Sequence, residues 1–76
     1  MTSRDQHLEW CKDRAMVYID DHDLINAMAS FASDLRKHPE TMDVGIATDY
    51  LLAALGTMYV MNNDVHGMRQ LIQGVR

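Results

Sequence analysis

The sequence predicts an all-α protein of four helices arranged as two antiparallel helical hairpins. The first observation is an internal repeat at an offset of 41 residues, in which Ala15-x2-Tyr18-x4-Asp23-Leu24-x2-Ala27-x3-Phe31 returns as Gly56-x2-Tyr59-x4-Asp64-Val65-x2-Met68-x3-Ile72. The second is the helical spacing of apolar residues on either side of two polar turns. Because each hairpin alone has one apolar face, we expect the two copies to cover each other.

The first hairpin is expected at residues 3–20 and 24–37. Ser3 and Gln6 form a capping-box pattern at the start of the first helix, and Asp23 is the expected N-cap of the second. Pro39 should end the second helix near residue 37. The core stripe of the first helix is Leu8, Cys11, Ala15, Tyr18 and Ile19.

The second hairpin is expected at residues 42–61 and 65–74, with Thr41 and Asp64 as N-caps. The segment 51–56 is apolar almost all round, which favours a central position for the third helix. Met28, Met58 and Met68 are interpreted as core residues, and Tyr18 and Tyr59 as packing residues of the two hairpins.

Length and charge limit the class of protein. Residues 1–76 form a single domain, and the net charge of −4 with scattered bases disfavours direct nucleic-acid binding. The amino terminus lacks the apolar segment of a signal peptide. The densest apolar run, 51–61, is shorter than the ~20 residues that span a bilayer. We therefore expect a cytoplasmic protein without a membrane partner.

The titratable residues do not form a catalytic or metal-binding pattern. His7 and Cys11 have an i, i+4 spacing that suits zinc, but no second pair matches it, so a buried structural cysteine is the preferred interpretation. The acidic cluster 20–23 is better explained by helix capping than by calcium binding. We expect no enzymatic activity, no cofactor and no metal.

One surface stands out as a candidate contact region. Trp10 and Val17 form a second apolar line, roughly opposite the core stripe of the first helix. That line is either covered by a neighbouring helix or exposed as an interface, and an exposed aromatic and aliphatic cluster is typical of interfaces. The predicted protein-interaction residues are Trp10, Lys12, Arg14, Met16 and Val17.

The first hairpin resembles a tetratricopeptide repeat at Ala15, Tyr18, Ala27, Phe31 and Pro39, and Gly56 and Tyr59 echo the pattern. The resemblance implies tetratricopeptide-like hairpin packing. It carries over no ligand-binding residue, because two incomplete repeats are too few for a peptide-binding groove.

A second resemblance extends over roughly residues 8–74. The stretches Leu8-Glu9-Trp10-Cys11-Lys12 and Ser33-Asp34-Leu35-x-Lys37-His38-Pro39-Glu40-Thr41 resemble a group of small helical proteins of tailed bacteriophages whose functions are not characterised. The resemblance implies a phage origin, and hence the host cytoplasm, and no particular activity.

The function expected from these observations is that of a small phage accessory protein. It would bind a host or phage protein and modulate or inhibit it. The alternative is a structural role, either in virion assembly or as a homo-oligomeric scaffold. A regulator that counters host defence is a third reading.

Overall fold

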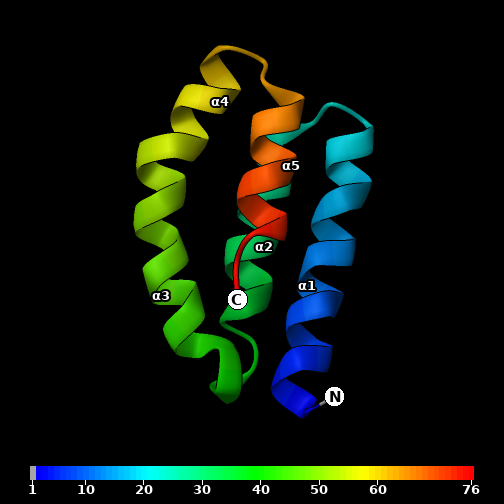
Figure 1. Ribbon diagram of the computed structural model, residues 1–76, viewed down its shortest axis with the longest axis vertical. Coiled ribbons are helices and arrows are strands. Elements are labelled where there is room, and N and C mark those ends of the chain that lie inside the picture. The colour runs from blue at the N-terminus through cyan, green and yellow to red at the C-terminus, as the bar shows by residue number, and fades with distance from the viewer. Residues whose placement is uncertain (1) are drawn as a thin grey trace.

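The computed structural model describes residues 2–76, and over that range the chain is helical and contains no strand. The prediction of an all-α protein with four helices is confirmed. Figure 1 shows α5 between α1 and the long α3–α4 segment, with α2 behind it. The elements are α1 (Ser3–Asp20), α2 (Leu24–Leu35), a short 3-10 turn η1 (Pro39–Thr41), α3 (Met42–Leu51), η2 (Leu52–Gly56), α4 (Thr57–Met61) and α5 (Val65–Gln73).

Side-chain caps define the starts of three helices. Asp23 accepts a hydrogen bond from the Asn26 amide at 3.2 Å, and Asp64 accepts one from the Gly67 amide at 2.8 Å, so both predicted caps are confirmed. The predicted Ser3 cap is wrong by one residue, because Thr2 accepts from the Asp5 amide at 3.1 Å.

The end of α2 differs slightly from the prediction. The helix ends at Leu35 instead of residue 37, since the Arg36 and Lys37 amides bond to carbonyls three residues back and tighten the last turn. Thr41 makes no side-chain cap for α3. Its hydroxyl instead donates to the Leu35 carbonyl at 2.5 Å, which ties η1 to the end of α2.

The turns after α1 and α4 have matching geometry. The Asp23 amide donates to the Tyr18 carbonyl, and the Asp64 amide donates to the Tyr59 carbonyl, both at 2.8 Å. The preceding residues, His22 and Asn63, both have left-handed backbones, with φ of 59° and 51°. These are the features of a Schellman-type helix end, so the repeated tyrosine and aspartate mark equivalent turns.

Helices α3 and α4 are joined without a break by the wider π turn η2. We call the continuous segment Met42–Met61 the rod. Thr48, Leu52 and Gly56 are spaced by four residues along it, and all three are buried. A π turn adds a residue to one helical turn, which lets a four-residue spacing stay on the same side of the rod.

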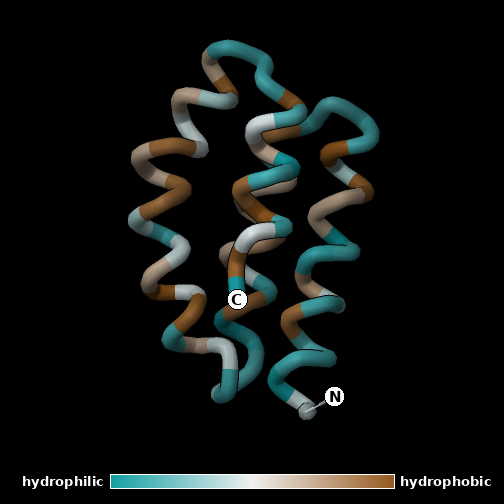
Figure 2. The backbone as a smooth tube through the Cα atoms, viewed as in Figure 1, coloured by the Kyte–Doolittle hydropathy of each residue, from teal (hydrophilic) through white to brown (hydrophobic). Residues whose placement is uncertain are grey.

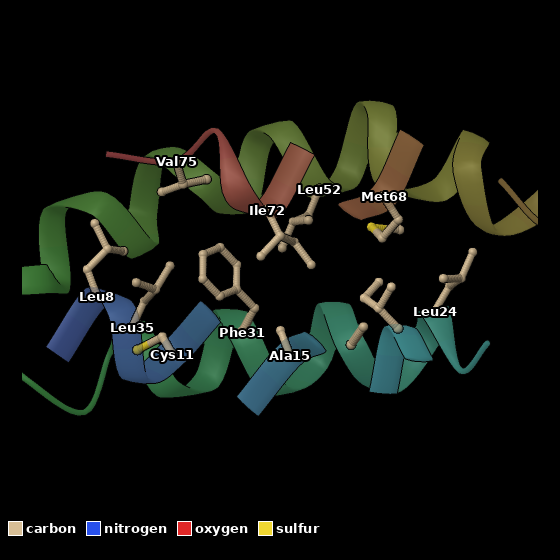
Figure 3. Close-up of a cluster of buried hydrophobic side chains, with 12 residues drawn as sticks. Leu8, Cys11, Ala15, Leu24, Phe31, Leu35, Leu52, Met68, Ile72 and Val75 are labelled. Carbon is tan, nitrogen blue, oxygen red and sulfur yellow. The ribbon is translucent and has the colours of Figure 1, made fainter. Parts of the chain in front are cut away.

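The hydrophobic core is built mainly by α1, α2 and α5. Figure 3 shows Phe31 of α2 among side chains from α1, α5 and the rod. Within residues 2–76, Leu52 is the single rod residue of this buried apolar cluster. The expectation that the third helix is the central element is therefore wrong, and the rod lies at the edge of the fold.

Small residues bring the rod close to α2. A Cβ at Gly56 would collide with the Met28 sulfur, and a Cβ at Gly45 would lie 3.3 Å from the Leu35 Cβ. An ion pair between Arg36 and Asp49 adds a polar link between α2 and α3. Of the large apolar residues of the rod, Leu52 is buried, three others are partly buried against the core, and seven are exposed.

Candidate protein-interaction surfaces

Trp10 lies on the outer side of α1 and is 42% exposed. Its ring stacks on His7 with centroids 5.3 Å apart, and the Arg14 guanidinium lies 4.8 Å from the ring centroid. The Lys37 ammonium is 6.0 Å from the same centroid. The cations of Arg14 and Lys37 therefore both lie near the accessible indole ring of Trp10, an arrangement that cation–π attraction stabilises.

The buried carboxylate of Asp34 positions these cations. Its oxygens accept hydrogen bonds from Arg14 at 2.7 Å, Lys37 at 3.0 Å and Ser30 at 3.3 Å. Burial opposes ionisation of Asp34, but the hydrogen bonds from Lys37 and Arg14 outweigh burial and hold the pKa of this carboxyl below its ordinary value. Charged Asp34 thus links α1 to α2 beneath Trp10.

The predicted interaction residues fall into two groups. Trp10, Arg14 and Val17 are exposed, with Val17 at 62%, so the second apolar line of α1 is not covered by a neighbouring helix. We call these three residues the α1 surface. The other two predicted residues lie elsewhere.

Lys12 and Met16 were predicted on this surface, and the structure corrects both. Lys12 is only 7% exposed, and its ammonium donates to the Gln73 carbonyl at 3.0 Å. Met16 is partly buried against the core, with its sulfur 4.0 Å from Arg69. Both side chains contact α5, whose position on this side of α1 does not follow from the periodicity of α1 alone.

Sequence reasoning missed Asp34 as the organiser of the α1 surface. The one available signal was Asp34 at a position where the tetratricopeptide pattern usually has alanine. His7 was considered only as a partner of Cys11, either in binding zinc or as an imidazole beside the thiol. Its Nε2 lies 2.8 Å from the Asp34 carbonyl, and its ring lies between those of Trp10 and His38.

Cys11 lies in the core and is inaccessible. Burial, with the nearby Asp34 charge second, raises the pKa of the Cys11 thiol to about 11. Within residues 2–76 no group of three or more histidine, cysteine, aspartate or glutamate side chains could hold a metal ion.

A larger apolar surface lies on the rod. Its residues point away from the core, and Tyr50 and Met61 are 76% and 81% exposed. Figure 2 shows hydrophobic residues recurring along the whole rod, which forms one edge of the molecule. Met58, predicted as core, belongs to this exposed set. We define the rod face as seven large residues, Met42, Ile46, Tyr50, Leu51, Leu55, Met58 and Met61. The small residue Ala54 is also exposed and lies between Tyr50 and Met58.

The rod has the reverse of the usual amphipathic pattern. Its fully buried positions are mostly small or polar, as at Gly45, Thr48 and Gly56, with Leu52 as the large exception, whereas seven of its large apolar side chains are exposed. A surface helix of a monomeric protein normally turns its apolar stripe inward. The sequence signal was the all-round apolarity of 51–56, which does not reveal which side faces the core.

The continuous helix also changes the length argument about membranes. The stretch Pro39–Met61 has 23 residues and is apolar enough to cross a bilayer by length and composition. Of its most apolar 18-residue segment, 22% is buried in the protein. It carries Glu40, Asp43 and Asp49 and no basic residue.

Comparison of the chain with protein-family models, with curated proteins and with solved structures gave no significant match.

Proposed function

We propose that this protein acts by binding other proteins and has no enzymatic activity. The observation that carries the proposal is the rod face, where seven large apolar side chains point to solvent. At their observed exposures they present on the order of 800 Å², more than the roughly 300–600 Å² of the largest apolar patch on a typical monomer. A surface of this size calls for a protein that covers it.

The α1 surface is the proposed site for modulating a host or phage protein. Trp10 and Arg14 are the residue types that dominate binding energy at interfaces. Arg14 and Lys37 are held by Asp34, so little conformational entropy would be lost when a partner covers the indole. Val17 extends the apolar part of this surface along α1.

The phage origin and the host cytoplasm are part of the same proposal, and they rest on the resemblance of residues 8–74 to small phage proteins. We also propose that the four helices correspond to two tetratricopeptide-like hairpins. The support is the equal geometry of the turns at His22 and Asn63. A role in virion assembly is the second candidate, and the extent of the rod face favours it.

Affinity capture from a bacterial lysate, followed by binding measurements with the purified partner, tests the proposal. Wild type should retain a specific protein, and Trp10→Ala should weaken that binding by about tenfold or more, as expected for an interface tryptophan. Ser33→Glu, an exposed position on α2, is the control and should bind like wild type.

A capture that retains no specific protein would contradict the modulatory role. Equal binding by wild type and Trp10→Ala would remove the α1 surface from the proposal. A Tyr50→Glu variant tested in parallel shows whether the rod face takes part in the same interaction.

A further inference from the structure

We infer that the protein that covers the rod face is a second copy of this chain, packed antiparallel across a twofold axis near Ala54. This inference rests on the proposed function, because it names the partner of the rod face. Area, spacing and charge each support it.

The exposed area matches what a stable dimer buries. The rod face presents on the order of 800 Å², and a standard protein interface buries about 800 Å² on each partner. The chain is also short, and a domain of this size gains modest stability from its own core. A second copy would complete the burial that the rod lacks.

The spacing of the rod face suits packing against itself. Met42, Ile46, Tyr50, Ala54 and Met58 follow one another at intervals of four residues, and all are exposed. A ridge of this spacing packs against the three-residue ridges of a neighbouring helix in the class whose axes cross at about +20°, which keeps two long helices in contact along their length. The face is therefore a ridge that can pack into the groove of an identical rod.

Ala54 provides a centre for the crossing. It is small and exposed, and the larger Tyr50 and Met58 lie four residues before and four residues after it. A twofold axis at Ala54 would let the two rods approach closely and would place Tyr50 of each copy beside Met58 of the other. Aromatic rings and thioether sulfurs attract each other, so the predicted pair is favourable.

Charge favours a second copy over a lipid surface. The seven residues of the rod face are all uncharged, so two copies would desolvate no ion from it. Asp49 at its edge already pairs with Arg36. Asp43 lies near the start of the rod, eleven residues before Ala54, so it would lie at the margin of the interface and not at its centre.

Analytical ultracentrifugation over a range of concentrations tests the inference. Wild type should be a dimer, and Tyr50→Glu should weaken dimerisation by about a hundredfold or more, because the interface would bury an unpaired charge. Val17→Glu is the matched control, since it also replaces an exposed apolar residue by glutamate but lies on α1. It should dimerise like wild type.

A cysteine at the twofold axis gives an independent measurement. Ala54→Cys should form a disulfide-linked dimer under mild oxidation, whereas Ser33→Cys should not, because Ser33 is exposed on α2 away from the rod face. The native Cys11 is buried and should not contribute. Circular dichroism of each variant establishes that it is folded.

Four results would overturn the inference. The first is a wild-type monomer at all concentrations without Ala54→Cys cross-linking. The second is a dimer that Val17→Glu disrupts and Tyr50→Glu leaves intact. The third is Tyr50-dependent flotation with phosphatidylcholine vesicles, which would assign the rod face to a membrane. A Tyr50-dependent complex with another protein, together with a monomeric wild type, would refute the dimer and retain the proposed function.

Discussion

The ammonium of Lys12 on α1 donates a hydrogen bond to the main-chain carbonyl of Gln73, the last residue of α5, at 3.0 Å. The final carbonyls of a helix lack partners within the helix, and a cation is favourable at that end. The methylene groups of the Lys12 side chain are buried. A residue that looks like part of an exposed charged surface therefore joins the first helix to the last.

Replacing Lys12 by methionine should lower the free energy of unfolding by about 1–2 kcal/mol, because the stem remains but the hydrogen bond from a charged group is lost. Urea unfolding followed by circular dichroism measures the change. Arg4→Met is the control, since Arg4 makes only a loose ion pair with Asp5 at 3.6 Å, and it should change stability by less than about 0.5 kcal/mol. Equal effects of the two variants would argue against a specific role of Lys12 at the end of α5.

Asp34→Asn should destabilise the protein at neutral pH by about 1–2 kcal/mol, because Arg14 and Lys37 donate to different carboxylate oxygens and the amide keeps only one acceptor oxygen, with no charge. The pKa of Asp34 is lower in the folded protein than its ordinary value of 3.8, so the folded state binds this proton less tightly than the unfolded chain does. This stabilisation is present above that ordinary pKa and is lost as the pH falls through the folded-state pKa.

Urea unfolding at a series of acidic pH values separates the charge effect from a change of shape. The difference in stability between wild type and Asp34→Asn should shrink as the pH falls below about 4. Asp13→Asn, at an exposed position on α1, should show a much smaller difference throughout. A difference for Asp34→Asn that stays constant down to acid pH would show that ionisation of Asp34 does not stabilise the fold.

The Cys11 thiol should react slowly with thiol reagents in the folded protein. It is inaccessible, and burial raises its pKa to about 11 from the ordinary 9.0. At about pH 8 the rate with a disulfide reagent should be at least ~100-fold lower than in urea-unfolded protein. Rapid stoichiometric labelling under native conditions would contradict the packing of Cys11.

The same raised pKa predicts alkaline destabilisation. The unfolded chain loses the Cys11 proton at lower pH than the folded protein, so this contribution to stability is complete below pH 9.0 and is lost as the pH rises towards about 11. Cys11→Ala should be less stable at neutral pH by about 1 kcal/mol, because it leaves a small cavity. Its stability should fall less steeply with pH over this alkaline range, as urea titrations at several pH values would show.

Gly67→Ala should destabilise the protein although alanine is the better helix former. A Cβ there would lie 2.7 Å from both the Asp64 carboxylate and the Tyr59 ring, so the cap of α5 or the ring must move. We expect a net loss of about 1–2 kcal/mol in thermal unfolding, since the clash outweighs a propensity gain of up to ~1 kcal/mol.

Gly74→Ala is the matched control for Gly67→Ala. Its Cβ would meet only main-chain carbonyls of the same helix, the nearest being that of Gln70 at 3.1 Å. It should change stability by less than about 0.5 kcal/mol. A stabilising effect of Gly67→Ala would show that Tyr59 and Asp64 can rearrange without cost.

The helices could be located from the sequence because their ends depend on neighbouring residues. Asp23 and Asp64 cap through bonds to amides three residues away, and Pro39 restricts the residue before it. The repeat of Tyr18 as Tyr59 also marks equivalent turns. Trp10 and Val17 were singled out correctly as a line off the core, although periodicity left open whether they would be covered.

Other features depended on contacts between distant segments. Asp34 gains its role from Arg14 across the α1–α2 interface, and Lys12 gains its partner only where α5 ends. Met58 was expected in the core because hydropathy measures a preference for burial without indicating which neighbour provides it. These errors share a cause, which is that the position of α5 and of the rod is not encoded in any single helix.

By itself, the sequence determined that this chain is helical, where its helices begin and where its two equivalent turns lie, because these depend on interactions within a few residues. Only the tertiary structure decided which side of the rod faces the core. The segment 51–56 is apolar almost all round, and the small residues Gly45 and Gly56 allow α2 to approach the rod closely, so seven large apolar side chains of the rod are left exposed. That choice depends on the fit between two surfaces, which periodicity does not describe.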